Sequence, residues 1–297
     1  MKKAFILLGL IPAIATAALA ERDQKLFDQI ERAAHEKTEG GRRQDCPFER
    51  IRLLTELQHN RMNAVARCRL GVIYRDFYDF KNEALREFEL FVRLSSNSDP
   101  EYAKVVRKVI PDLRAKIARS AEERLNANSR NPIKASALLA EGSALEAKHD
   151  AVSAMKKYEA ALVEDPLADL AALAIARLKG RNARSEKDVY GVLAMYRMAI
   201  DLNPSKQASY REAATFAYQH QRWNSTVAIL DRALANFPAS GEFLDMMIAA
   251  LTKLEHIELA EAWRRFRLSI AAAGGGKNAQ QSTDKILISN TEEGKVS

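Results

Sequence analysis

Residues 135–168 read ASALLAEGSALEAKHDAVSAMKKYEAALVEDPLA, and this stretch decides the fold. Apolar side chains recur in it at helical spacing, first around Gly142 and then from Ala154 to Tyr158, on either side of a polar turn at 147–150. Two antiparallel helices that pack about 8–10 Å apart need small residues where they cross, and Gly142 and Ala154 supply them. The stretch therefore predicts a hairpin of two helices.

The spacing of the prolines predicts that this hairpin recurs along the chain. Pro132, Pro166, Pro204 and Pro238 are 34, 38 and 34 residues apart, and Pro100 precedes Pro132 by 32 residues. A proline ends one helix and begins the next, because it has no amide proton and it restricts the residue before it. One hairpin cannot bury its apolar face alone, so successive hairpins are expected to stack.

In these residues the sequence resembles the tetratricopeptide repeat, a 34-residue helix–turn–helix family. Gly142, Ala154 and Tyr158 stand at the small, small and aromatic positions of the repeat, and Pro166 stands at its terminal proline. The segment 70–74, Leu-Gly-Val-Ile-Tyr, reproduces the family's Leu-Gly-x-x-Tyr phrase. The resemblance implies an all-α fold, a right-handed α-α superhelical solenoid of helix hairpins.

The repeat register also predicts how the chain is divided. The expected segments are a signal peptide at 1–20, an N-terminal helical region at 21–134 with one clear repeat at 64–97 and a degenerate repeat or irregular helix pair at 101–134, the repeat array at 135–270, and a disordered tail at 271–297. Pro111 is expected to break or kink the helix of the degenerate unit. In the last repeat, Arg264 and Arg267 occupy usually apolar and small positions, which is typical of a capping repeat with a polar outer face.

The first twenty residues have the form of a transport signal. Lys2 and Lys3 precede an apolar stretch, and Ala18-Leu19-Ala20 offers the small-x-small pattern of a cleavage site before Glu21. We expect cleavage after Ala20 and export to the periplasm of a bacterium. The alternative is an uncleaved anchor helix, and only in that case is the membrane an expected partner.

The charge of the chain argues against nucleic acid as a partner. The formal net charge is +7, of which Lys2 and Lys3 contribute two. No run of five or six basic residues marks a nucleic-acid-binding arm, so the excess charge is that of an ordinary solvated surface.

The two cysteines, Cys46 and Cys68, are a candidate disulfide. An oxidising compartment permits such a bond, which would tie the helix predicted at about 47–60 to the first repeat. The alternative is two buried thiols, because sequence alone does not reveal the geometry that a disulfide requires.

No pattern in the sequence predicts catalysis. The five histidines form no His-Glu-x-x-His motif, and neither Cys-x-x-Cys nor Gly-x-Ser-x-Gly occurs. We therefore expect no enzyme activity, no metal and no cofactor.

Binding is the remaining expectation. In the family that the chain resembles, the first helices of successive repeats line a concave groove. By position, the candidate groove residues are Leu139, Ser143, Glu146, Leu173, Arg177, Arg181, Arg211, Thr215 and Tyr218. Arginine forms bidentate bonds with carboxylates, so this groove suits a peptide with acidic groups. The alternative is that the three arginines are merely solvated.

The resemblance implies a scaffold or adaptor that binds a protein or peptide partner in the bacterial envelope. By analogy with the family, the partner would belong to a secretion, pilus or cell-wall assembly. A self-associating structural oligomer and a regulatory subunit of an envelope enzyme are the alternatives.

Overall fold

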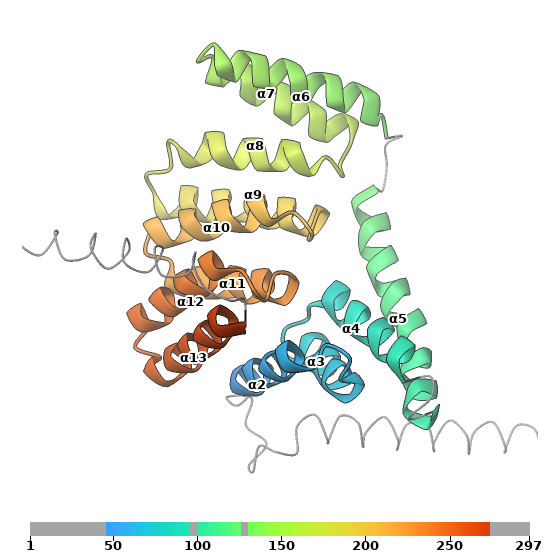
Figure 1. Ribbon diagram of the computed structural model, residues 1–297. Helices are drawn as coiled ribbons and strands as arrows, with labels where there is room; N and C mark the ends of the chain where they lie inside the picture. The colour runs from blue at the N-terminus through green and yellow to red at the C-terminus, as the bar shows by residue number, and fades with distance from the viewer. Residues whose placement is uncertain (1–45, 96–99, 126–129, 274–297) are drawn as a thin grey trace, which may run out of the picture.

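The structure, a computed structural model, describes residues 46–95, 100–125 and 130–273, so the signal segment at 1–20 and most of the predicted tail lie outside the described residues. Within them the chain forms twelve helices and no strand (Figure 1). The helices are α2 (Cys46–His59), α3 (Ala64–Asp76), α4 (Lys81–Leu94), α5 (Pro100–Leu125), α6 (Pro132–Ala147), α7 (Ala151–Glu164), α8 (Asp169–Gly180), α9 (Glu186–Leu202), α10 (Gln207–Gln219), α11 (Trp223–Asn236), α12 (Gly241–Lys253) and α13 (Ile257–Ala273). None of these helices is both long and apolar enough to cross a bilayer.

The helices pack as stacked hairpins, which confirms the predicted all-α, right-handed solenoid. Helices α6 and α7 pair, as do α8 and α9, α10 and α11, and α12 and α13, and each hairpin packs on the next through α7 and α8, α9 and α10, and α11 and α12. The predicted helix at about 47–60 is also confirmed, as α2. The pair α3 and α4 forms a further hairpin before the array.

Side-chain caps begin several of these helices. The side chains of Asn63, Asn131 and Asp150 accept hydrogen bonds from backbone N–H groups in the first turns of α3, α6 and α7. Ser185 and Asp188 form a reciprocal capping box at the start of α9. Each such cap satisfies donors that a helix leaves unpaired at its N-terminus.

A glycine facing an aromatic ring sets the separation of the helices within a hairpin. A Cβ atom on Gly142 would lie 2.5 Å from Cε1 of Tyr158, and one on Gly71 would lie 2.8 Å from Cδ1 of Phe88. The rings of Tyr158 and Phe88 are buried there. Both glycines therefore permit a helix contact that any larger residue would prevent.

Residues 100–125 form one helix of 26 residues, α5, and not the hairpin expected from the repeat length. Pro111 lies inside this helix, so it does not end it. Val105, Val106, Ile110 and Leu113 are buried, and α4 is the main helix that α5 packs against. Beyond Leu113 the described side chains of α5 are exposed, apart from a half-buried one at 117. This part of α5 extends along the array towards α6 and α7 (Figure 1).

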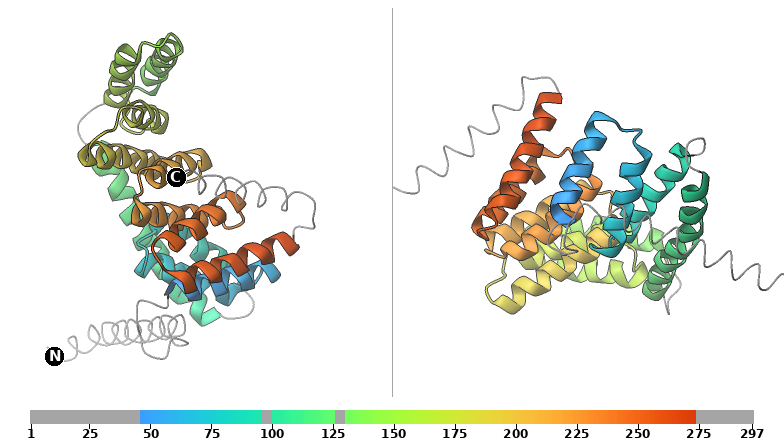
Figure 2. Two further views of the ribbon diagram at one scale, coloured as in Figure 1. Left: turned by 90° about the vertical axis from the view of Figure 1, so that its left-hand side faces the viewer. Right: turned by 90° about the horizontal axis from the view of Figure 1, so that it is seen from below.

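The N-terminal helices pack on the C-terminal repeats and close the arrangement. Helix α2 lies against α13 (Figure 2), and Ser269 donates a 2.8 Å hydrogen bond to Gln58. Between α4 and α11, Arg86 donates to the carbonyl of Ala235 at 2.5 Å, and Asn236 donates to Glu83 at 2.7 Å. The last repeat is thus covered by α2 and is not the free polar cap that was expected.

A buried arginine lies at the centre of this contact. Arg50 of α2 is fully buried and pairs with Asp231 of α11 at 2.5 Å. Its guanidinium carbon lies 4.6 Å from the ring centroid of Tyr78 and 5.0 Å from that of Trp263. One side chain therefore links α2, α11, α13 and the turn after α3.

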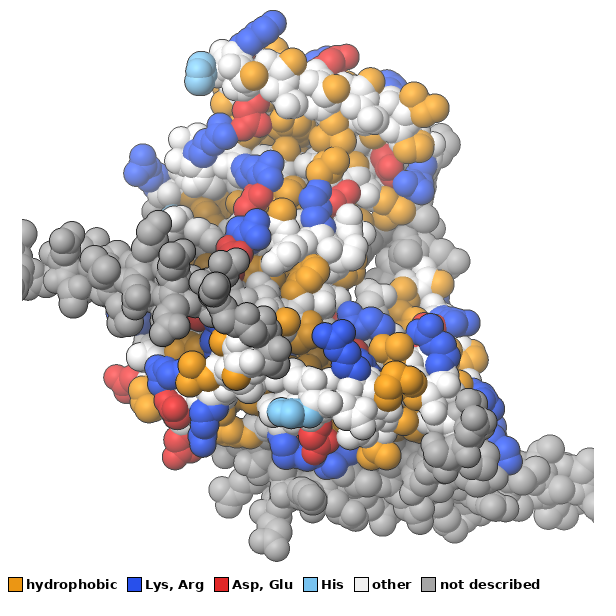
Figure 3. Space-filling model, in the orientation of Figure 1, with side chains coloured by type: hydrophobic (Ala, Val, Ile, Leu, Met, Phe, Trp, Pro, Cys, Tyr) orange, Lys and Arg blue, Asp and Glu red, His pale blue; other side chains and the backbone are white. Residues whose placement is uncertain are grey.

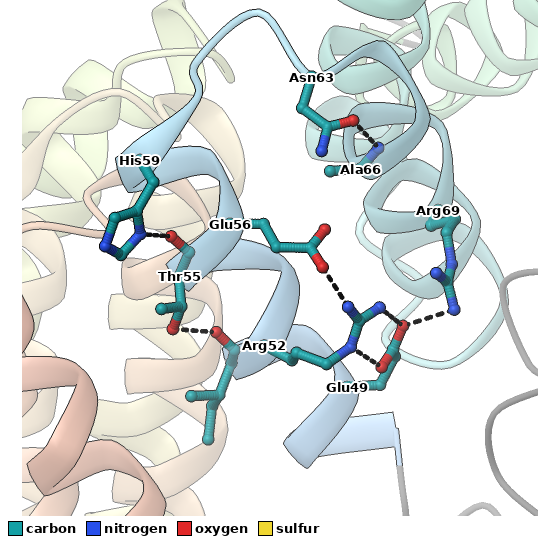
Figure 4. A network of polar contacts seen from close by, with 9 residues as sticks. Glu49, Arg52, Thr55, Glu56, His59, Asn63, Ala66 and Arg69 are labelled. Carbon is teal, nitrogen blue, oxygen red and sulfur yellow. Dashed lines mark hydrogen bonds and ion pairs between the residues drawn. The ribbon is translucent and has the colours of Figure 1, made fainter.

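Ion pairs outside this centre join α2 to α3 (Figure 4). Glu49 accepts two hydrogen bonds from Arg52 at 2.6 and 2.7 Å and forms a 2.8 Å ion pair with Arg69 of α3. Arg52 also pairs with Glu56 one turn further along α2. Of these contacts, the pair of Glu49 with Arg69 crosses from α2 to α3, and those of Arg52 lie within α2.

The candidate disulfide is not formed in the structure: Cys46 and Cys68 are both buried as thiols. Cys46 begins α2 and interacts electrostatically with Tyr78, just past the end of α3. Cys68 lies in the second turn of α3. A disulfide requires a specific approach of the two Cα atoms, and these two side chains do not form one here.

We expect opposite effects from alanine at two glycines. Gly142→Ala should lower the free energy of unfolding by about 1–2 kcal/mol, because the methyl group overpacks against Tyr158. Gly191→Ala is the matched control: it lies within α9 and a Cβ there meets no atom within 4 Å, so the better helix propensity of alanine should stabilise by about 0.5–1 kcal/mol. Urea unfolding followed by circular dichroism measures both. Equal effects would show that Gly142 does not set the contact between α6 and α7.

Arg50→Met should destabilise the protein by about 3–5 kcal/mol near pH 7.5, because it leaves the Asp231 carboxylate buried without its partner. Burial raises the pKa of Asp231 and Arg50 opposes that rise, so the substitution should raise the pKa further. A group whose pKa is raised on folding loses its stabilising proton as the pH increases. The difference from wild type should therefore be smaller at pH 5 than at pH 7.5, as measured by urea titration. In an Arg50→Met/Asp231→Asn variant this pH dependence should be largely absent. If it persisted, the Asp231 carboxyl would not be the group that causes it.

Candidate functional site

The predicted groove residues lie on the first helices of three successive hairpins. Leu139, Ser143 and Glu146 are on α6, Leu173 and Arg177 are on α8, Arg181 follows α8 directly, and Arg211, Thr215 and Tyr218 are on α10. Leu173 is only 1% exposed and belongs to the core. The ring of the half-buried Tyr218 packs edge-on against Trp223.

Each of the three arginines in this set already holds a carboxylate of a neighbouring hairpin. Arg177 donates to Glu212 at 2.5 and 2.6 Å, and Arg211 donates to Glu242 through Nε at 2.7 and 2.8 Å. Arg181 pairs with Glu146 in the same way. The three pairs join α6, α8, α10 and α12 in sequence, and we call them the arginine–glutamate ladder.

The ladder was not foreseen from the sequence, although a signal for it was present. Glu212 follows Arg177 by 35 residues and Glu242 follows Arg211 by 31, which is close to one repeat length. Residues one repeat apart lie side by side on neighbouring first helices, so opposite charges at that spacing indicate a pair. In the space-filling view, basic and acidic side chains accordingly alternate along the array (Figure 3).

The ladder makes these arginines less available to a ligand. The hydrogen bond to Glu212 raises the pKa of Arg177, so the charge is held in place by its internal partner. Exposed ion pairs contribute at most about 1 kcal/mol each, but an acidic ligand must still displace an existing carboxylate. The predicted groove therefore offers no unpaired charge at its three arginines.

The structure also contains a cleft of about 700 Å³ on the other side of the hairpins. It lies between α5, the second helices α9 and α11, and the turn from α3 to α4. The residues that line it are Tyr78, Asp79, Phe80, Lys81, Asn82, Ile117, Ser120, Tyr190, Leu193, Ala194, Arg197, Ile200, Asp201, Tyr210, Ser225, Ala228, Ile229 and Arg232. We call it the α5–α11 cleft.

Apolar side chains form much of the wall of the α5–α11 cleft. Ile117 contributes from α5, Leu193 from α9 and Ile229 from α11, and all three are half-buried. Tyr190 of α9 is 52% exposed, and the Arg222 guanidinium lies 5.2 Å from its ring centroid. These apolar side chains stand among charged and hydroxyl-bearing ones, and a cleft of this volume is of the size that binding sites have.

The charged residues that line the cleft are paired with one exception. Lys81 pairs with Asp79 at 3.1 Å, and Arg232 pairs with Asp201 and lies 3.6 Å from Glu83. Arg197 is exposed and forms no ion pair or hydrogen bond among the described residues. Among the described side chains that line the cleft, Arg197 is therefore the charged one without an ion pair.

Sequence reasoning missed this cleft, because the repeat family directs attention to first helices. A signal was present in α9, where Tyr190, Ala194 and Arg197 follow one another at the i, i+4 and i+7 spacing of one helix face. Of these three, Tyr190 contacts Arg222 just before α11, whereas Ala194 and Arg197 are exposed. Among the described residues, no group of three or more His, Cys, Asp or Glu side chains is placed to hold a metal ion.

The helix hairpins and their order define the class of this protein as an all-α solenoid of stacked helix hairpins. No family model matches the sequence, and no curated protein matches it. Among solved structures it is similar to a MamA protein at 13% identity, with 68% of this chain and 92% of that chain covered and a TM-score of 0.40. A second MamA structure is similar at 12% identity over 67% and 95%, with a TM-score of 0.39. The TPR2AB domain of yeast Sti1 in complex with pHSP90 is similar at 14% over 82% and 84%, with a TM-score of 0.32.

We expect the arginine–glutamate ladder to contribute little to stability. Arg211→Ala should lower the free energy of unfolding by less than about 1 kcal/mol, since both partners are largely solvated. A double-mutant cycle with Glu242→Ala should return a coupling of about 0.2–1 kcal/mol that falls on adding salt. Arg197→Ala removes no ion pair or hydrogen bond from the part of the chain that the structure describes, so its unfolding curve should match that of wild type. A coupling of several kcal/mol would contradict the solvated geometry.

Proposed function

We propose that the protein is a non-catalytic scaffold that holds a segment of another protein in the α5–α11 cleft. The observation that carries the proposal is a preformed concave surface with apolar walls, bounded by α5, α9 and α11. Repeat solenoids bind partners on such surfaces, because each hairpin adds to one extended face.

The walls of the cleft are held in position by contacts made elsewhere. The first half of α5 is buried with α4, and α4 is tied to α11 by the hydrogen bonds of Arg86 and Asn236. The wall formed by α9 belongs to the packed array. The protein would therefore lose little conformational freedom on binding, and the ordering cost would fall mainly on the partner segment.

The predicted groove on α6, α8 and α10 remains a second candidate surface. An acidic partner there would exchange its carboxylates for those of Glu212 and Glu242, which lie on the same face. If that surface binds the partner, Arg177→Glu plus Arg211→Glu should weaken binding without unfolding the chain. The unpaired Arg197 favours the α5–α11 cleft instead.

We further propose that the scaffold acts in the bacterial envelope. The support for this is the signal-like segment at 1–20, with its cleavage pattern at 18–20. A partner in a secretion, pilus or cell-wall assembly would fit that location. Self-association and a role as regulatory subunit remain the alternatives, and light scattering of the purified chain separates a monomeric adaptor from an oligomer.

Filling the cleft tests the proposal. Ala194 and Ala228 line the cleft and are both exposed, so Ala194→Arg plus Ala228→Arg should occupy it without disturbing the core. Affinity capture from envelope fractions should then lose a protein that wild type retains, with binding reduced at least about tenfold, equivalent to about 1.4 kcal/mol. Ala140→Arg is the matched control, because Ala140 is an exposed alanine on α6. Equal capture by all three proteins, with unchanged thermal unfolding, would remove the cleft as the binding site.

A further inference from the structure

We infer that the occupant of the α5–α11 cleft is a partner segment that carries an Asp or Glu side chain next to apolar residues, and that Arg197 binds its carboxylate. This inference rests on the proposed function and names the chemistry of the partner. It also moves the acid-binding position from the first helices of the array to the second helix α9.

The first support is the difference in pairing between two sets of arginines. Arg177, Arg181 and Arg211 are each matched by a glutamate of a neighbouring hairpin. Arg197 has no such partner among the described residues, although it lines a cleft that also contains two aspartates. Asp79 and Asp201 are engaged by Lys81 and Arg232, so neither neutralises it.

The second support is the position of Arg197 relative to the apolar wall. Tyr190, Leu193, Ala194 and Arg197 share one face of α9, and seven residues of helix separate the first from the last. At a rise of 1.5 Å per residue this is about 10 Å. The cleft thus presents an aromatic ring and an aliphatic side chain at one end and a cation at the other.

This spacing describes the segment that fits. A partner with an apolar side chain against Tyr190 and Leu193 would place a carboxylate at Arg197 about three residues further on if extended, at about 3.3 Å per residue. A helical segment would need about seven residues, which is two turns. A basic residue at the same place would be repelled, so the cleft selects for acidic segments.

The charges at the Tyr190 end do not compete with this selection. Arg222 packs over the Tyr190 ring but forms a 2.9 Å ion pair with Glu186. Within the described part of the lining, Arg197 is therefore the charged side chain that has no ion-pair partner. A charge-assisted hydrogen bond there should contribute a factor of about ten or more to affinity.

The test is a selection of random peptides displayed on phage against the purified full chain, without reference to any natural partner. Wild type should enrich peptides in which Asp or Glu lies about three or seven residues from a large apolar residue. Arg197→Glu should lose these peptides by at least about tenfold and enrich Lys or Arg at the same position instead. Arg197→Lys should retain the acidic preference. Arg211→Glu is the matched control: it makes the same charge change on the arginine–glutamate ladder, and it should leave the selection unchanged.

The outcomes separate this inference from the proposed function. Peptides that bind wild type, are lost with Ala194→Arg plus Ala228→Arg and yet show no acidic preference would overturn the role of Arg197 while leaving the cleft as a binding site. Acidic peptides that respond to Arg211→Glu and not to Arg197→Glu would place the acid-binding position on the ladder. No peptide sensitive to filling of the cleft would remove the proposed function itself. A chain that self-associates through the cleft would identify a second copy as the occupant and overturn the inference.

Discussion

The packing of the N-terminal helices on the last two hairpins is the contact on which the rest of the structure depends. Arg50 is buried there between Asp231, Tyr78 and Trp263. A buried guanidinium is tolerated only with a carboxylate and further favourable contacts, because its desolvation is costly. The contact therefore admits one arrangement of α2 against α11 and α13, and it fixes where α4 and then α5 begin.

The cleft follows from this closure. Because α4 is tied to α11, α5 has to leave α4 beside the array, and its first half is buried before the rest extends past α9 and α11. A simple stack of hairpins would have no helix opposite the second-helix face. The α5–α11 cleft therefore arises from a helix that departs from the repeat pattern, and the regular hairpins supply the opposite wall.

The two faces of the array use their charges differently. On the first helices, each arginine of the arginine–glutamate ladder forms an ion pair with a glutamate of a neighbouring hairpin. These pairs contribute modestly to the stacking of the hairpins. On the second helices, Arg197 is left exposed beside apolar residues. A charged side chain without an internal ion pair is available to a partner. This difference favours the α5–α11 cleft over the predicted groove on α6, α8 and α10 as the binding surface.

The sequence alone determined the helices, the hairpins and the solenoid. These depend on local and repeated features that are visible in the residues: the small residues Gly142 and Ala154, the aromatic Tyr158, and prolines at repeat spacing. It did not reveal that 100–125 forms one helix. The burial of Val105, Val106, Ile110 and Leu113 stabilises this helix, and it outweighs the unfavourable Pro111. Only the tertiary structure decided that Arg50 contacts Asp231, 181 residues away, and that Cys46 and Cys68 are buried without forming a disulfide. It also decided that Arg177 and Arg211 are paired, while Arg197 has no ion pair among the described residues. Those outcomes depend on which helices come into contact when segments far apart in the sequence pack together. No local sequence pattern predicts those contacts.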